Sequence, residues 1–180
     1  SGDGAGPVPS YFPKGYKHFW CMKYEITQQQ YADFLNTLTE AQANGRFANN
    51  FDSYRHFIKK ADTVYGCDGN KNNHLNESDD GKDIACNYLS WADGIAYADW
   101  AAMRPMTELE FEKASRGHLL PFVNGFANGD TVLKNPGSYV VNNCMENEKS
   151  PMNSTNCNFR QGGSVGGPMR VGCFTSGTRL

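Results

Sequence analysis

The chain has 180 residues, of which 39% are hydrophobic, and its 17 basic and 19 acidic side chains give a net charge of −2. This length predicts a single domain. The near-neutral charge argues against a nucleic-acid partner, because nucleic-acid-binding domains cluster Lys and Arg and have a high pI. No apolar run approaches the roughly 18 residues that span a bilayer, so we expect no membrane span.

The N-terminal stretch 1–10 is rich in Gly, Pro and Ser, and it lacks the basic and apolar regions of an intact signal peptide. We expect residues 1–15 to be a flexible segment. Residues 16–180 are then expected to form one domain, with a polar insertion at 66–83.

Six cysteines occur in the chain, and no two of them form a Cys-x-x-Cys pair that would indicate a zinc or redox site. Cys67 and Cys86 bracket one polar loop, and Cys144 and Cys157 bracket another. Disulfides at these two places and free buried thiols fit the sequence equally well. The cysteine content slightly favours an extracellular or cell-surface protein over a cytoplasmic one.

Three capping boxes predict three helices, because in each a Ser or Thr side chain can accept a hydrogen bond from the backbone three residues later. The three pairs are Thr27 with Gln30, Ser90 with Asp93, and Thr107 with Glu110. The first helix is expected to end near Leu38 and the third at Gly117. Large rings at helical spacing indicate a core contribution from Phe34, Trp91, Trp100 and Phe111.

Short runs of aromatic and aliphatic residues predict strands. His56–Lys59 and Thr63–Tyr65 are close enough to pair as a hairpin. The other candidate strands are Phe19–Ile26, Tyr139–Val141 and Arg170–Phe174. Long polar stretches at 66–83 and 142–167 separate them, and ordered loops of that length are usually functional or pinned in place.

Two segments carry a family resemblance. The first, residues 19–35, reads Phe-Trp-Cys-Met-Lys-Tyr-Glu-Ile-Thr-Gln-Gln-Gln-Tyr-Ala-Asp-Phe-Leu. The second begins at residues 87–100, Asn-Tyr-Leu-Ser-Trp-Ala-Asp-Gly-Ile-Ala-Tyr-Ala-Asp-Trp, and continues into residues 104–117, Arg-Pro-Met-Thr-Glu-Leu-Glu-Phe-Glu-Lys-Ala-Ser-Arg-Gly. Both resemble signatures of the formylglycine-generating enzyme or sulfatase-modifying factor family. The resemblance implies an α+β, C-type-lectin-like fold with two main helices, short twisted antiparallel strands and much irregular loop.

Departures from the family pattern bear on activity. The oxidases of the family bind copper through two cysteines close together in the C-terminal third, whereas Cys157 and Cys173 are 16 residues apart here. Iron-dependent relatives need a His-x-x-x-His-x-Glu motif. None of the four histidines has that spacing: His18, His56, His74 and His118. We therefore expect no copper or iron site in this chain and no enzymatic activity. The family's later Gly-Asn-Val-Trp-Glu strand is also missing before Leu180, so we expect the domain to lack its C-terminal strands.

Residues 68–79 have the ligand register of an EF-hand or dockerin-type calcium loop. Oxygen-bearing side chains occupy loop positions 1, 3, 5, 9 and 12, and position 7 would contribute a backbone carbonyl. The predicted Ca²⁺ ligands are Asp68, Asn70, Asn72, His74, Asn76 and Asp79. The alternative is a solvated Asn- and Asp-rich insertion.

The leading functional hypothesis is a non-catalytic ligand-binding or display module of the type found in variable proteins of diversity-generating retroelements, with a protein or other macromolecule as its ligand. Only the loop at 142–158 is nominated as a contact surface, against the alternative of an ordered structural loop. Two other functions compete: a formylglycine-generating oxidase whose catalytic cysteines lie outside this chain, and a calcium-dependent structural or adhesive domain.

Overall fold

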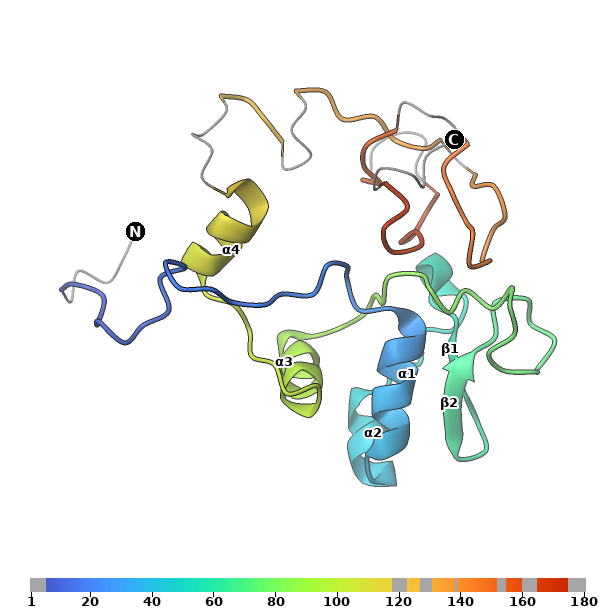
Figure 1. Cartoon of the computed structure of the whole chain (residues 1–180). Coiled ribbons are helices and arrows are strands. Elements are labelled where there is room, and N and C mark those ends of the chain that lie inside the picture. Colours follow the sequence, from blue (N-terminus) through green and yellow to red (C-terminus); the bar gives the residue numbers. More distant parts are fainter. Residues whose placement is uncertain are drawn as a thin grey trace.

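The computed structural model describes residues 6–117, 123–126, 131–137, 139–151, 155–159 and 165–174. It is an α+β structure with four α-helices, one 3-10 helix and one two-stranded antiparallel sheet in its described part. The elements in chain order are α1 (Gln28–Thr37), α2 (Glu40–Arg46), η1 (Ser53–Arg55), β1 (Ile58–Ala61), β2 (Val64–Cys67), α3 (Trp91–Trp100) and α4 (Glu108–Arg116). Figure 1 shows α1, α2 and the hairpin side by side, with α4 farther from them.

The three predicted helices are confirmed, because each begins at its expected capping box. Thr27, Ser90 and Thr107 are the N-caps of α1, α3 and α4, and each side chain accepts a hydrogen bond from the backbone three residues later. Helix α1 ends one residue before Leu38, and α4 ends at Gly117, where φ is +65°. Such a left-handed terminus suits glycine, which has no Cβ to clash with the preceding turn.

The expectation of two main helices is wrong, since the described part of the chain has four. Helix α2 was not predicted, although Thr39 and Gln42 form a fourth capping box that begins it. With only seven residues, α2 depends on tertiary contacts. Ala43 is its buried residue, and the Arg46 carbonyl accepts a hydrogen bond from the Tyr31 hydroxyl at 3.1 Å.

The predicted hairpin is present, with Ile58 paired to Cys67 and Ala61 to Val64, but both strands begin and end later in the chain than predicted. The other three strand predictions are wrong in extent. Residues 19–26 form no strand, and only the following Thr27 makes an isolated bridge, to Ala85. Tyr139–Val141 and Arg170–Phe174 likewise reduce to single bridges, Val141 with Lys149 and Arg170 with Ile84. A strand needs a continuous partner edge, and the described residues give these segments only single contacts.

The main core lies between α1, the hairpin and one side of α3. Its central aromatic contact joins Phe34 of α1 to Tyr97 of α3, with ring centroids 5.7 Å apart in an edge-on arrangement. The buried hydrophobic residues of this cluster are Tyr31, Ala32, Phe34, Leu35, Ala43, Ile58, Tyr65, Cys67 and Tyr97. The prediction that Phe34 is core is therefore confirmed, since only 1% of it is exposed.

The core prediction is wrong for the other three rings. Trp91 is 74% exposed, Trp100 is 44% exposed and Phe111 is 59% exposed. Helix α3 buries Tyr97 and packs Trp100 against Phe34, whereas Trp91 and Ile95 remain exposed. Helical spacing identifies an apolar face but not the surface that covers it. Together with residues 19–26, α3 and α4 line a groove of about 1070 Å³.

All six cysteines are free thiols, so the disulfide alternative for the two bracketed loops does not hold in this structure. Four of them are buried or nearly so, at Cys67, Cys86, Cys144 and Cys173. They pack as small apolar side chains, which is the commonest role of a buried cysteine. No helix in the described part of the chain has the length and hydropathy to cross a membrane.

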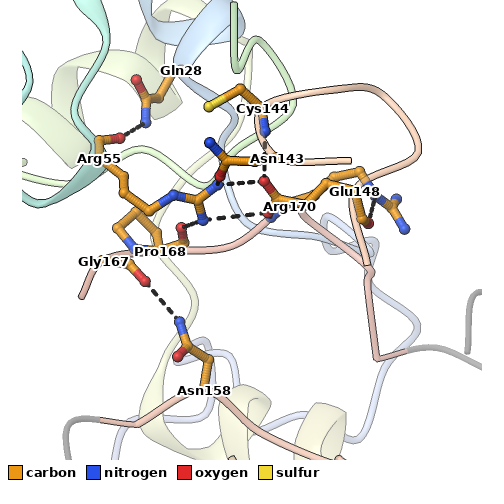
Figure 2. A network of polar contacts seen from close by, with 9 residues as sticks. All are labelled: Gln28, Arg55, Asn143, Cys144, Glu148, Asn158, Gly167, Pro168 and Arg170. Atoms are coloured by element: carbon orange, nitrogen blue, oxygen red, sulfur yellow. Dashed lines mark hydrogen bonds and ion pairs between the residues drawn. The ribbon is translucent and has the colours of Figure 1, made fainter. Parts of the chain in front are cut away.

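A buried carboxylate joins η1 to the C-terminal coil. Glu148 has no exposed area, and both its oxygens accept from the Arg55 guanidinium. The same carboxylate also accepts from the backbone N–H groups of Cys144 at 2.9 Å and Arg170 at 3.0 Å. Arg55 donates further to the Pro168 carbonyl and to the Asn143 side chain. Figure 2 shows Arg55 at the centre of these contacts.

We predict that Glu148→Gln lowers the free energy of unfolding by about 3 kcal/mol, because it leaves the largely buried Arg55 guanidinium without its counter-charge. Chemical denaturation measures this change. Asp52→Asn is the matched control, since the Asp52–Lys71 pair is about half exposed and such pairs contribute less than about 1 kcal/mol. Equal effects of the two substitutions would contradict the structural role of Glu148.

Candidate functional site

The predicted calcium loop is a closely hydrogen-bonded turn that follows β2. Asp68 is fully buried, and its carboxylate accepts from Lys59 Nζ at 2.9 Å and from the Asn73 backbone N–H at 3.3 Å. The Asn76 side-chain oxygen accepts from the Cys67 backbone N–H at 2.8 Å. Two of the predicted ligand side chains therefore hold the loop to the hairpin.

The remaining predicted ligands lie on the exposed side of the loop. The side-chain oxygens of Asn70 and Asn72 accept from backbone N–H groups two residues later, at 3.0 Å and 2.7 Å. His74 is exposed, and its own N–H is the donor to Asn72. Asp79 accepts from the Asn70 amide nitrogen at 2.9 Å.

Three carboxylates of this loop lie together. Glu77, Asp79 and Asp80 each offer an oxygen within 4.8 Å of the other two. Glu77 accepts from the amides of Asn72 and Asn70, and these hydrogen bonds lower the pKa of its carboxyl. Such an all-oxygen set fits the preference of Ca²⁺ for hard ligands. Of these three, only Asp79 was among the calcium ligands predicted from the sequence. Glu77 and Asp80 could have been found from the three acidic residues that the sequence places within positions 77–80.

A cavity of about 570 Å³ lies between η1, the segment before α3 and the C-terminal coil. Its volume is within the roughly 300–1,000 Å³ range of small-molecule sites. Tyr54 and Tyr88, which both line it, are 58% and 40% exposed overall. The described residues that line it are Tyr54, Asn87, Tyr88, Asn158, Phe159, Gly166, Gly167 and Pro168. None of these side chains is charged.

The backbone around this cavity is strained. Tyr54, Arg55 and Tyr88 have φ values of +47°, +62° and +59°, a left-handed region that bulky side chains seldom occupy. Each such residue costs about 1–3 kcal/mol, and such residues concentrate at ligand clamps and active sites. Gly167 approaches Tyr54 so closely that a Cβ at position 167 would overlap the Tyr54 carbonyl oxygen.

His56 is a buried residue that contacts two residues of the cavity lining, Asn87 and Tyr88. It is 2% exposed, its Nδ1 lies 2.8 Å from Asn87 Oδ1, and its ring meets the Tyr88 ring edge-on. Asn87 Nδ2 in turn donates to the Tyr54 carbonyl at 2.9 Å. Burial lowers the pKa of His56, outweighing its hydrogen bond to Asn87. The neutral imidazole with Nδ1 protonated therefore fits this site, because Asn87 Oδ1 can only accept.

A second cavity, of about 510 Å³, brings together Cys157 and Cys173, which the sequence separates widely. Lys23, Glu25 and Arg170 also line it. Burial raises the pKa of Cys173 to about 11, so its thiol stays protonated near neutral pH. Burial likewise raises the pKa of Cys86 to about 12 and raises that of Cys144.

Part of the first cavity was predictable from the sequence. The nominated loop at 142–158 ends at Asn158, which lines it, although residues 152–154 lie outside the described residues. Earlier in that loop, Asn143 and Glu148 bind Arg55, as expected of the structural-loop alternative. Tyr54 gave no sequence signal, because its place depends on a left-handed backbone that no Gly or Asn marks.

We predict that the free energy of unfolding falls as the pH drops below about 6.5. The unfolded His56 then binds a proton that the native, buried ring resists, so the loss approaches about 1.4 kcal/mol per pH unit until the native pKa is reached. Above that range both states are neutral and His56 adds no pH dependence. Proton NMR should place the His56 midpoint below 6.5, the ordinary value for histidine; a midpoint at or above 6.5 would contradict the prediction.

Comparison with known proteins gives one match. No curated protein matches the chain, and neither does any solved structure. The sequence does match the sulfatase-modifying factor enzyme 1-like domain over residues 13–174, which includes both signature segments and every described residue of the two cavities. The chain therefore belongs to the sulfatase-modifying factor enzyme 1-like domain family.

Proposed function

We propose that this protein is a non-catalytic binding module on a C-type-lectin-like scaffold, and that the cavity beside Tyr54 and Tyr88 is its ligand site. The observation that carries the proposal is the pair of exposed tyrosines on a strained backbone around a cavity whose described lining residues carry no charge. Strain persists only where the surrounding structure enforces it, which here means the Glu148 network and the His56–Asn87 contact.

The chemistry of the cysteines supports a non-catalytic role. A thiol acts as nucleophile or metal ligand in its thiolate form, and burial opposes that form at Cys86, Cys144 and Cys173. Cys21, the exposed one, lies on the groove at 19–26 rather than on the cavity that holds Cys157 and Cys173. The oxidase alternative would need copper-binding cysteines from sequence outside this chain.

The proposed ligand is a protein or other macromolecule. The proposed class of the protein itself is a variable protein of a diversity-generating retroelement. The coil around the cavity supports this, because it is irregular and contributes side chains to the site without belonging to the core. Loops on a stable scaffold can vary without loss of the fold. A reverse-transcriptase gene and a template repeat beside this gene would test the retroelement origin.

We predict that the chain binds ligands at the cavity and does not oxidise a sulfatase-derived cysteine peptide. In a fragment screen by amide NMR, the shifted resonances should be those of Tyr54, Tyr88, Asn158 and Gly167, with Tyr139 as the unaffected control. Mass spectrometry of the peptide after incubation with copper and oxygen should detect no aldehyde. Aldehyde formation would establish the oxidase instead, and shifts confined to other surfaces would remove the site.

A calcium-dependent structural domain is the second candidate, favoured by the carboxylates of Glu77, Asp79 and Asp80. These side chains would hold Ca²⁺, and the ion would neutralise their mutual repulsion and hold the loop. The sequence-predicted ligands would instead place Asp68 on the ion, where Lys59 now supplies the positive charge. The two ligand sets share Asp79.

We predict that CaCl₂ gives a binding heat in calorimetry and that Asp79→Asn weakens affinity by at least about tenfold, since a charged oxygen ligand is lost. Glu77→Gln tests the acidic cluster alone and Asp68→Asn tests the sequence register alone. Asp62→Asn, in the exposed hairpin turn, is the control. A lack of heat with the unaltered protein would eliminate the calcium function.

A further inference from the structure

We infer that His56 is an acid-sensitive switch for the cavity beside Tyr54 and Tyr88: its neutral ring holds the two tyrosines in place, and its protonation releases them. The inference rests on the proposed function, because it describes the regulation of that same site. It depends on three features of the structure: the burial of the His56 ring, the contacts of that ring with the cavity lining, and the strained backbone that those contacts hold.

The buried position of the His56 ring is unsuited to a charged imidazole. Because Nδ1 already carries a proton toward Asn87, acid adds the next proton at Nε2. Nε2 is buried and has no hydrogen-bond partner among the described residues. A charged ring in this position would therefore bury both a charge and an unpaired N–H group. Moving into water removes that cost, so protonation favours a structure in which the ring has left its position.

The described surroundings of His56 supply no counter-charge for a charged ring. Tyr88 is the titratable side chain in contact with it, and α1 contributes the uncharged Gln28, which binds the backbone on both sides of His56. The charged side chains of the adjoining turn are paired with other residues, Asp52 with Lys71 and Arg55 with Glu148. Burial therefore lowers the pKa of His56, although Asn87 and the Ala48 carbonyl favour its charged form.

The contacts of the His56 ring extend to both tyrosines. Nδ1 lies 2.8 Å from Asn87 Oδ1, and Asn87 Nδ2 donates to the Tyr54 carbonyl at 2.9 Å. The His56 ring also meets the Tyr88 ring edge-on, with centroids 5.4 Å apart. When the His56 ring leaves, Asn87 and Tyr88 lose a partner at the same time.

The two tyrosines have a backbone that these contacts help to hold. The value of φ is +47° at Tyr54 and +59° at Tyr88, and such left-handed conformations persist only where the surroundings enforce them. Loss of the His56 contacts therefore lets both residues return to ordinary backbone angles. Because both tyrosines line the cavity, that change alters its shape.

The test titrates the full chain from about pH 7.5 to about pH 4.5, the range in which histidines titrate, and records NOEs by NMR. With a midpoint below 6.5, the NOE between the His56 and Tyr88 rings should disappear. The NOE between the amide and Hα protons of Tyr54, which is strongest for a left-handed φ, should weaken with the same midpoint. The NOE between the Phe34 and Tyr97 rings in the core should persist.

Three variants assign the transition to His56. In His56→Asn, whose amide replaces Nδ1 but does not titrate, the Tyr54 NOE should be the same at both ends of the titration. His18→Asn, which removes an exposed histidine, is the matched control and should leave the transition unchanged. Asn87→Ala removes the link between His56 and Tyr54, so the Tyr54 NOE should already be weak at neutral pH.

Several results would overturn the switch. These are a ring-to-ring NOE that persists after His56 has titrated, a Tyr54 transition that survives His56→Asn, and changes that occur only together with loss of the Phe34–Tyr97 NOE, which indicates global unfolding. Because no ligand is added, the result is independent of the fragment screen. Fragment binding without the transition would leave the proposed function and remove the switch, whereas the transition without fragment binding would do the reverse.

Discussion

The full burial of the Glu148 carboxylate is the constraint on which the C-terminal half of the structure depends. A carboxylate without exposed area must be matched by charge and by hydrogen bonds, and Arg55 and the backbone N–H groups of Cys144 and Arg170 supply both. These partners come from three separate stretches of chain. Irregular coil can be ordered in this way with no sheet to hold it, because one buried charge fixes several backbone groups at once.

The local part of the fold could be predicted from sequence, because its signals are short-range. A capping box specifies a helix start through residues three apart, and Thr27, Ser90 and Thr107 all do so. The same chemistry at Thr39 would have given α2 as well. The hairpin was equally local, since its two strands are separated by a short turn.

Burial and the site could not be predicted in the same way, because they depend on which surfaces meet. Trp91 and Phe111 lie on apolar faces that the described residues leave exposed, while Tyr97 takes the buried position on α3. Arg55 and Glu148 are 93 residues apart, and nothing in either neighbourhood specifies the other as its partner. The spacing of oxygen-bearing residues predicted a calcium loop with Asp68 as a ligand. In the structure the Asp68 carboxylate instead pairs with Lys59.

The cavity is lined partly by residues next to a locally specified helix start and partly by residues of the C-terminal coil, and this division bears on which ligand the cavity can bind. Asn87 and Tyr88 lie just before the N-cap of α3, and His56, beside the hairpin, contacts both of them. Asn158 and Gly167 come from coil whose position depends on the Glu148 network. One wall therefore depends on local scaffold chemistry, because Asn87 and Tyr88 lie just before the capping box that begins α3 at Ser90. On the opposite wall Gly167 is fixed by its close approach to the Tyr54 carbonyl oxygen, and Asn158 donates a hydrogen bond to the Gly167 carbonyl. Phe159 belongs neither to a capping box nor to the buried core clusters, so its side chain can change without disturbing either of them.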